Sequence, residues 1–291
     1  MEKINKEMNV EFEYLFVNDG STDNTLGIMR ELASKNPSCV RYISFSRNFG
    51  KESALYAGIE NATGDYVVAM DVDLQHPPSL LPKMYDLIKH NAYDCVGTRR
   101  VNRVGEPAIR SFFSKSFYKI INKISHTKIV EGATDYQLMT RQMVDAVLTL
   151  PEYNRFSKGI FSWVGFNTYY LEYENVERET GKTTWSFWGL VKYAIDGVVA
   201  FSEVPLVIAS IIGLLTFALS VILGLVIAIK TLIFDNPTDG WTTLVCLITG
   251  LGGLQLFCLG ILGYYLGKTY LETKKRPIYI TKETEISNLK K

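Results

Sequence analysis

The sequence predicts an α/β fold built on a mostly parallel sheet, followed by two C-terminal helices that cross a membrane. Three observations lead to this prediction. Short apolar runs alternate with helical patterns from Tyr14 to Gly97, which is typical of strands joined by helices. Polar clusters follow the ends of these apolar runs. Residues 204–267 hold almost no charge.

The expected strands are short and apolar, and they are Tyr14–Val17, Val40–Phe45, Tyr66–Met70 and Tyr93–Gly97. Helical patterns lie between them, at Asp23–Ser34, Glu52–Asn61 and Pro78–His90. In sheets of this class, ligands bind at the carboxyl ends of the strands. We therefore expect the functional site at the turns that follow the strands.

Two apolar runs, from about Pro205 to Ile229 and from about Thr242 to Gly267, are each long enough to cross a bilayer, which takes ~20 apolar residues. A buried helix of a soluble protein is the alternative, and two such runs in succession disfavour it. Lysines flank the pair of runs on both outer sides, whereas the loop between them is acidic. The positive-inside rule therefore predicts a multi-pass protein of the cytoplasmic membrane with its N-terminal domain in the cytoplasm.

The expected divisions of the chain are residues 1–185 for the α/β domain, 186–203 for an amphipathic helix, 204–267 for the two membrane helices and 268–291 for a cytoplasmic tail. The segment 186–203 is apolar around most of its helical surface, with Lys192 and Asp196 on a polar stripe. Its place beside the membrane predicts an interfacial helix, and a core helix of the soluble domain is the alternative. Small residues at helical spacing (Ser220 with Gly224, Gly263 with Gly267) are compatible with a homo-oligomer.

Composition excludes several classes of function. The formal net charge is +1, so we expect no nucleic-acid partner. The four cysteines are scattered and form no disulfide framework, which favours a reducing compartment. The three histidines are equally dispersed and show no zinc spacing.

Two polar clusters follow the first two expected strands. Asp19 comes directly after the first, where a carboxylate is placed to accept hydrogen bonds from a base or ribose; capping of the next helix by Thr22 or Asp23 is the alternative. Arg47 and Lys51 follow the second strand and open a helix, where they suit a diphosphate. A solvated turn is the alternative for this pair.

Asp71-Val72-Asp73 follows the third expected strand. Residues two apart in an extended chain share a face, so both carboxylates are expected to converge on one hard cation, Mg²⁺ or Mn²⁺. Such a cation bridges diphosphate oxygens and neutralises a leaving group. This pair is the sharpest functional signal in the sequence.

The segments VNDGSTDNT, SFSRNFGKESAL, GDYVVAMDVDLQHPP, TDYQLM and RFSKGIFSWVGF, with the two membrane runs, resemble the family 2 inverting glycosyltransferases. The similarity is to the branch of polyprenyl-phosphate hexosyltransferases, which includes bactoprenol glucosyltransferases and dolichol-phosphate mannose synthases. The resemblance covers about Phe12 to Gly267. It implies a GT-A fold, a nucleotide-sugar donor with UDP-glucose favoured, a Mg²⁺ or Mn²⁺ ion and a polyprenyl phosphate (undecaprenyl phosphate) as acceptor.

Carried onto this sequence, the resemblance implies a nucleotide-sugar site of Asp19, Arg47, Lys51, Asp71 and Gln75, with Asp71 and Asp73 as metal ligands. Asp135 and Asp73 are the implied catalytic residues, Asp135 lying on the acceptor side. The implied cations for the acceptor phosphate are Arg110, Lys115, Arg178 and Lys182. For each of these four cations, a solvated surface charge is the alternative.

The family pattern begins with a strand that this sequence lacks, because Met1–Val10 resembles only the end of the helix that follows it. That strand lies centrally in the GT-A sheet, so its absence is expected to leave two strands with unpaired edges. We expect an incomplete start rather than a decayed enzyme, since the later motifs are intact. The alternative function is a non-catalytic membrane scaffold that retains the glycosyltransferase fold. A processive polysaccharide synthase is disfavoured, because the sequence has no Gln-x-x-Arg-Trp motif.

Overall fold

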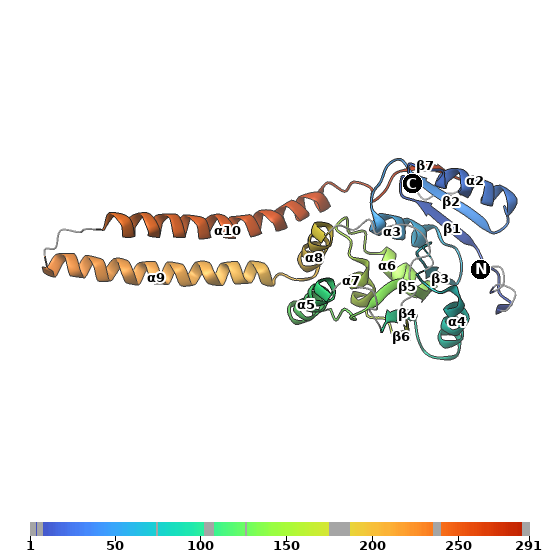
Figure 1. Cartoon of the computed structure of the whole chain (residues 1–291), viewed down its shortest axis with the longest axis horizontal. Coiled ribbons are helices and arrows are strands. Elements are labelled where there is room, and N and C mark those ends of the chain that lie inside the picture. The colour runs from blue at the N-terminus through green and yellow to red at the C-terminus, as the bar shows by residue number, and fades with distance from the viewer. Residues whose placement is uncertain are drawn as a thin grey trace. The chain divides into compact units, whose positions relative to one another are not determined.

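The computed structural model describes residues 4, 8–73, 75–101, 108–125, 127–174, 187–234 and 240–286. The chain forms two compact units, one of Met1–Phe201 with Lys275–Lys291 and one of Ser202–Lys274. The first unit holds both sheets, and the second consists of two long helices (Figure 1).

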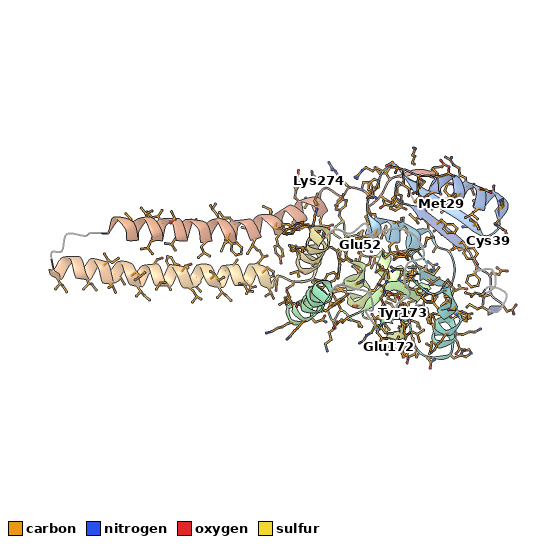
Figure 2. The ribbon with its side chains drawn as sticks, in the orientation of Figure 1. Met29, Cys39, Glu52, Glu172, Tyr173 and Lys274 are labelled. Atoms are coloured by element: carbon orange, nitrogen blue, oxygen red, sulfur yellow. The ribbon has the colours of Figure 1, made fainter. Side chains whose placement is uncertain are left out.

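The first sheet has three strands in the order β1-β2-β7, at Tyr14–Asn18, Val40–Phe45 and Thr281–Thr284. β1 and β2 are parallel, whereas β7 comes from the end of the chain and runs antiparallel to β2. Helix α2 (Thr25–Lys35) covers this sheet, burying Met29 and Ala33 against Val40 and Tyr42 (Figure 2). The sequence pattern predicts β1, β2 and α2 but no strand near the C-terminus.

The second sheet has four strands in the order β3-β5-β4-β6, at Tyr66–Ala69, Ala133–Thr140, Cys95–Arg100 and Thr168–Tyr173. β5 is antiparallel to both of its neighbours, and β4 and β6 are parallel. The predicted α/β class with mostly parallel strands is confirmed, because β3, β4 and β6 all run in one direction. β5, which comes later in the chain, inserts between β3 and β4 in the opposite direction.

Helices on the faces of these sheets form the core of the first unit. They are α3 (Lys51–Asn61), α4 (Leu81–His90), α5 (Ala108–Ile124), α6 (Arg141–Leu148), α7 (Ser157–Trp163) and α8 (Phe187–Phe201), with a short 3₁₀ turn at Pro78–Leu80. α3 touches both sheets, because Gly58 lies against Val17 of β1 and Ile59 packs with Val67 of β3. This helix is the structural bridge between the two sheets.

β1 and β3 each form an edge of their sheet. Within the described part of the chain, β1 pairs with β2 alone and β3 with β5 alone. β7 and β6 form the other edges of these sheets, and the strand expected to be missing beside β1 and β3 stays a prediction. Near the start of β1, the Glu13 carboxylate accepts hydrogen bonds from the backbone N–H groups of Thr63 and Gly64, just before β3.

The second unit consists of α9 (Val204–Phe234) and α10 (Trp241–Thr273). Val204–Ile227 and Leu247–Thr273 are long and apolar enough to cross a membrane, with mean hydropathies of 2.7 and 1.6. Leu214, Phe217 and Leu256 are among the many apolar side chains exposed on these helices. A helix buried in a soluble core would cover such side chains, so a membrane is the environment that suits them.

Candidate active site

Asp19 holds the loop that precedes α3. Its carboxylate accepts hydrogen bonds from the backbone N–H of Phe49 (2.6 Å) and of Gly50 (2.9 Å), at the start of that helix. Gly20 has a φ of +69°, and a Cβ there would lie 2.5 Å from the backbone of Arg47, so only glycine fits. Asp19 therefore stabilises the N-terminus of α3, a role in addition to the nucleotide contact expected from the sequence.

Asp23 accepts hydrogen bonds from the N–H and the hydroxyl of Thr25, the first residue of α2. These bonds lower the pKa of Asp23. Asp23 therefore stabilises the start of α2, which is the alternative role expected for this cluster. Asp19 stabilises the start of α3 instead.

Arg47 and Lys51, predicted as a pair, point to different partners. The Arg47 guanidinium lies 4.1 Å from the centre of the Phe49 ring and donates a hydrogen bond to the carbonyl of Asn48. The Lys51 ammonium lies 2.8 Å from Asp71 and 2.6 Å from Asp135. Lys51 thus joins the turn after β3 to the first part of β5.

The charges of neighbouring side chains favour the ionised forms of Asp135 and Lys51. Burial opposes ionisation of Asp135, but Lys158 and Lys51 outweigh it and lower the pKa of that carboxyl. Burial opposes protonation of Lys51, yet Asp135 and Asp71 raise its pKa well above the usual value. Two lysines thus offset the charges of the two carboxylates at this point.

The Asp71–Asp73 segment is a turn rather than an extended strand. β3 ends at Ala69, Val72 is exposed, and Asp73 accepts a hydrogen bond from the N–H of Gln75 at 3.2 Å. The expectation that an extended chain places both carboxylates on one face is therefore wrong, because the strand ends before them. The two carboxylates stay close in sequence within the turn.

His76 supports this turn and was missed by the sequence analysis. The N–H of Asp71 donates to His76 Nδ1 at 3.3 Å, and the buried His76 ring stacks on Tyr136 with centroids 5.3 Å apart. Burial lowers the pKa of His76. The signal available in the sequence was a histidine three residues after the second aspartate.

The donor set fits a hard divalent cation. Among the described residues, no group of three or more His, Cys, Asp or Glu side chains could hold a metal alone. Mg²⁺ in nucleotide sites is usually held by one or two carboxylates, with water and substrate phosphates completing the shell. Asp71 and Asp73 match that arrangement in number and in ligand chemistry.

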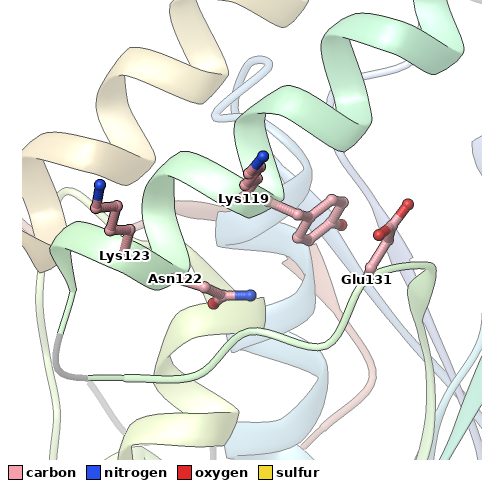
Figure 3. A pocket seen from close by; sticks show the side chains of 5 residues that line it. Lys119, Asn122, Lys123 and Glu131 are labelled. Carbon is pink, nitrogen blue, oxygen red and sulfur yellow. The ribbon is translucent and has the colours of Figure 1, made fainter.

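The four expected acceptor cations fall outside the described side chains. Arg110 and Lys115 lie on α5, whose described side chains begin further along the helix, and Arg178 and Lys182 lie outside the described residues. Their roles stay predictions. α5 also borders a shallow pocket of about 550 Å³, lined by Tyr118, Lys119, Asn122, Lys123 and Glu131 (Figure 3). None of these residues belongs to the Lys51 cluster.

Comparison with known proteins identifies the class. The model of glycosyl transferase family 2 matches residues 2–148. The chain belongs to glycosyltransferase family 2, and it is a glycosyltransferase with the GT-A type of α/β fold.

Individual relatives make the similarity more specific. The chain is 45% identical over 97% of its length to CsbB of Bacillus subtilis (strain 168), a protein named as a glycosyltransferase, and covers 85% of that protein. It is 42% identical to the prophage bactoprenol glucosyl transferase homolog of Escherichia coli (strain K12), covering 94% of this chain and 89% of that one. Among solved structures, glucosyl-3-phosphoglycerate synthase from Mycobacterium tuberculosis is similar at a TM-score of 0.36 and 17% identity, with 64% and 66% of the two chains covered.

Proposed function

We propose that this protein transfers glucose from UDP-glucose to a polyprenyl phosphate (undecaprenyl phosphate) with inversion of configuration. The observation that carries the proposal is the 42% identity, over almost the whole chain, to proteins named bactoprenol glucosyl transferase. The Lys51, Asp71 and Asp135 cluster supports a catalytic protein, because a scaffold has no need to gather these charges. A non-catalytic scaffold is accordingly not favoured.

The donor side of the proposed site consists of the loops after β1, β2 and β3. Asp71 and Asp73 would hold Mg²⁺ or Mn²⁺, which supplies positive charge to the diphosphate as it leaves. Asp19 holds the loop that carries Arg47 and Lys51, and these two cations would face the diphosphate. Gln75, whose N–H bonds to Asp73, completes the proposed donor site.

On the acceptor side, the chemistry calls for positioning rather than proton removal. A phosphate monoester has a second pKa near ~6, so much of it is already dianionic at neutral pH. Arg110, Lys115, Arg178 and Lys182 are proposed to offset its repulsion from the donor diphosphate. Asp135, held ionised by Lys51 and Lys158, would orient a sugar hydroxyl. Direct attack at C1 then gives a β-linked product from an α-linked donor.

We also propose that α9 and α10 cross the cytoplasmic membrane, with the catalytic unit in the cytoplasm beside the lipid acceptor. Lys274 and Lys275 follow the second apolar span in the sequence, and Lys192 precedes the first, in agreement with the positive-inside rule. Gly224, Gly263 and Gly267 have open space where a side chain would stand, which is compatible with a homo-oligomer packed through these helices.

The proposal is tested by incubating membranes that contain the full chain with labelled UDP-glucose, undecaprenyl phosphate and Mg²⁺. We expect chloroform-extractable label that depends on the metal and disappears in Asp73→Ala. Other labelled nucleotide sugars tested in parallel establish donor preference. If well-expressed wild-type protein forms no lipid-linked product with any nucleotide sugar, the proposed function is wrong.

A further inference from the structure

Helix α8 is held on the catalytic unit by one of its faces. Tyr193, Gly197 and Phe201 follow one another at spacings of four residues and therefore share that face. A Cβ on Gly197 would lie 3.4 Å from the Phe156 ring, and the Tyr193 ring lies 5.2 Å from the same ring. Phe201 fills the space beside Gly159 on α7, where an added Cβ would clash with its ring. α8 is thus closely packed on α7.

The rest of α8 is directed away from this contact and leads to the first apolar helix. Trp188 is 77% exposed and Ile195 is 46% exposed, although both are large apolar side chains. Only Ser202 and Glu203 separate the end of α8 from the start of α9.

The Tyr193 hydroxyl links α8 to α3. It donates a hydrogen bond to Oε1 of Glu52 at 2.9 Å, while the backbone N–H of Ser157 donates to Oε2 at 3.0 Å and the Ser157 hydroxyl donates to the same oxygen. Three donors from α7 and α8 thus meet one carboxyl group of α3, which Figure 2 marks. A carboxylate, which only accepts hydrogen bonds, satisfies all three. In a Glu52→Gln variant, an amide NH₂ group replaces one of the two accepting oxygens, so the hydrogen bonds to that oxygen are lost or reversed.

This three-helix contact adjoins both cations that act on Asp135. Lys51 precedes Glu52 in the first turn of α3, and its ammonium contacts Asp135 at 2.6 Å. Lys158 follows Ser157 in α7, and its charge lowers the pKa of Asp135. The Glu52 carboxyl therefore belongs to the residue next to Lys51, and its partner Ser157 is the residue next to Lys158.

We propose that Glu52 is a positioning residue that couples the packing of α8 to the Lys51–Asp135 ion pair. This inference rests on the proposed function, in which Asp135 belongs to the acceptor side. Glu52 acts through Lys51 and Ser157 and contacts neither substrate. Seating of α8 on α7 keeps the Glu52 carboxyl in place, and the two lysines then hold Asp135 in its productive position.

The test compares Tyr193→Phe, Glu52→Gln and the double variant in the full chain, in membranes. Tyr169→Phe is the matched control, because this half-exposed tyrosine of β6 keeps its ring contact with Tyr93 when its hydroxyl is removed. We expect each single variant to lower kcat for the lipid product by about tenfold, a typical effect of slightly misplaced groups. KM for the nucleotide sugar should stay within about twofold, and the double variant should be no slower than Glu52→Gln, since both changes break one unit.

Hydrogen exchange supplies a readout that does not need turnover. Tyr193→Phe should speed exchange of the backbone amides at the start of α3 and of α7, while Tyr169→Phe leaves them unchanged. Unchanged exchange in Tyr193→Phe overturns the coupling, as does an effect of the double variant equal to the product of the single effects. Wild-type protein without lipid product would instead count against the proposed function, and the exchange result would still decide the coupling.

Discussion

The two sheets of the catalytic unit are completed in different ways. The second sheet is built from residues 66–173, and it supplies the Asp71 turn and Asp135. The first sheet carries the Asp19 loop on β1 but needs β7, from the far end of the chain, as its third strand. The difference shows that Asp71 and Asp135 belong to the sheet whose strands are close together in the sequence. The other sheet depends on a strand from the C-terminal end of the chain.

The side-chain contacts that hold the strands of the two sheets also differ. In the second sheet, β4 and β5 share the buried hydrogen bond between the Thr98 and Thr134 hydroxyls, at 2.6 Å. In the first sheet, β7 is held by Glu283, whose carboxylate accepts from Arg30 at 2.7 Å and from the Tyr42 hydroxyl at 2.7 Å. Changes in the second sheet should therefore affect turnover, and changes around β7 should affect stability.

The largest expected effect comes from Asp135→Asn in the second sheet. The change keeps the shape of the side chain but removes the charge that pairs with Lys51, so that Lys51 is left with Asp71 alone. Turnover should fall by about 10²–10³, as for other groups that stabilise charge in an active site. Steady-state formation of lipid-linked sugar measures kcat, and calorimetric binding of UDP with Mn²⁺ measures donor affinity, which should change little.

Asp145→Asn is the control for this change, because Asp145 lies on α6 with only a 3.9 Å contact to Arg141. Turnover of Asp145→Asn should match wild type. Full turnover in Asp135→Asn would show that the charge of Asp135 has no part in the reaction.

An intermediate effect is expected from Tyr279→Ala, just before β7. The Tyr279 ring stacks on Phe45 of β2 with centroids 4.9 Å apart, and its hydroxyl donates to Glu60 at 2.7 Å. Loss of a partly buried aromatic ring should lower the free energy of unfolding by about 2–3 kcal/mol. Denaturant unfolding followed by circular dichroism measures this change.

Tyr279→Phe keeps the ring but removes the hydrogen bonds of the hydroxyl with Glu60 and Asn61, and it should cost about 1–2 kcal/mol, at about 1 kcal/mol for each bond. In both variants, kcat per folded molecule should stay near the wild-type value. An equal loss in the two variants would mean that ring packing contributes nothing to the attachment of β7.

The smallest effect is expected from Glu283→Gln, and it should depend on pH. The hydrogen bond from Arg30, followed by that from Tyr42, lowers the pKa of Glu283 to about 2. A carboxyl whose pKa is lowered by folding stabilises the protein above its unfolded pKa, and this stabilisation fades as pH falls toward the folded pKa. Wild type should therefore exceed Glu283→Gln in melting temperature at pH 7, and the difference should shrink as pH approaches 3. A constant difference across this range would contradict the assigned cause.

Sequence periodicity was sufficient for the elements whose pattern is local. The strand at Val40–Phe45 and the helices at Thr25–Lys35 and Lys51–Asn61 lie where they were predicted, within one or two residues. β7 was not predictable in this way, because Thr281–Thr284 is polar and half exposed. Such a strand is defined by its pairing with β2, which is a long-range contact and leaves no periodic apolar pattern.

The residues of the site also differ in whether a local sequence pattern reveals them. Asp71 and Asp73 were recognisable because two carboxylates follow an apolar run. The meeting of Lys51 with Asp135 joins positions far apart in the chain, and the antiparallel insertion of β5 brings it about. Glu52 gave no signal in the sequence, and His76 gave only its position after Asp73, since the roles of both residues depend on partners that folding brings near.

The origin of β7 sets an order of assembly. Synthesis from the N-terminus makes β1, β2 and the whole second sheet before α9 and α10, and it makes β7 last. Until Thr281–Thr284 has left the ribosome, the edge of β2 that β7 covers has no strand on it. The first sheet of the catalytic unit can therefore close only after both apolar helices have been made.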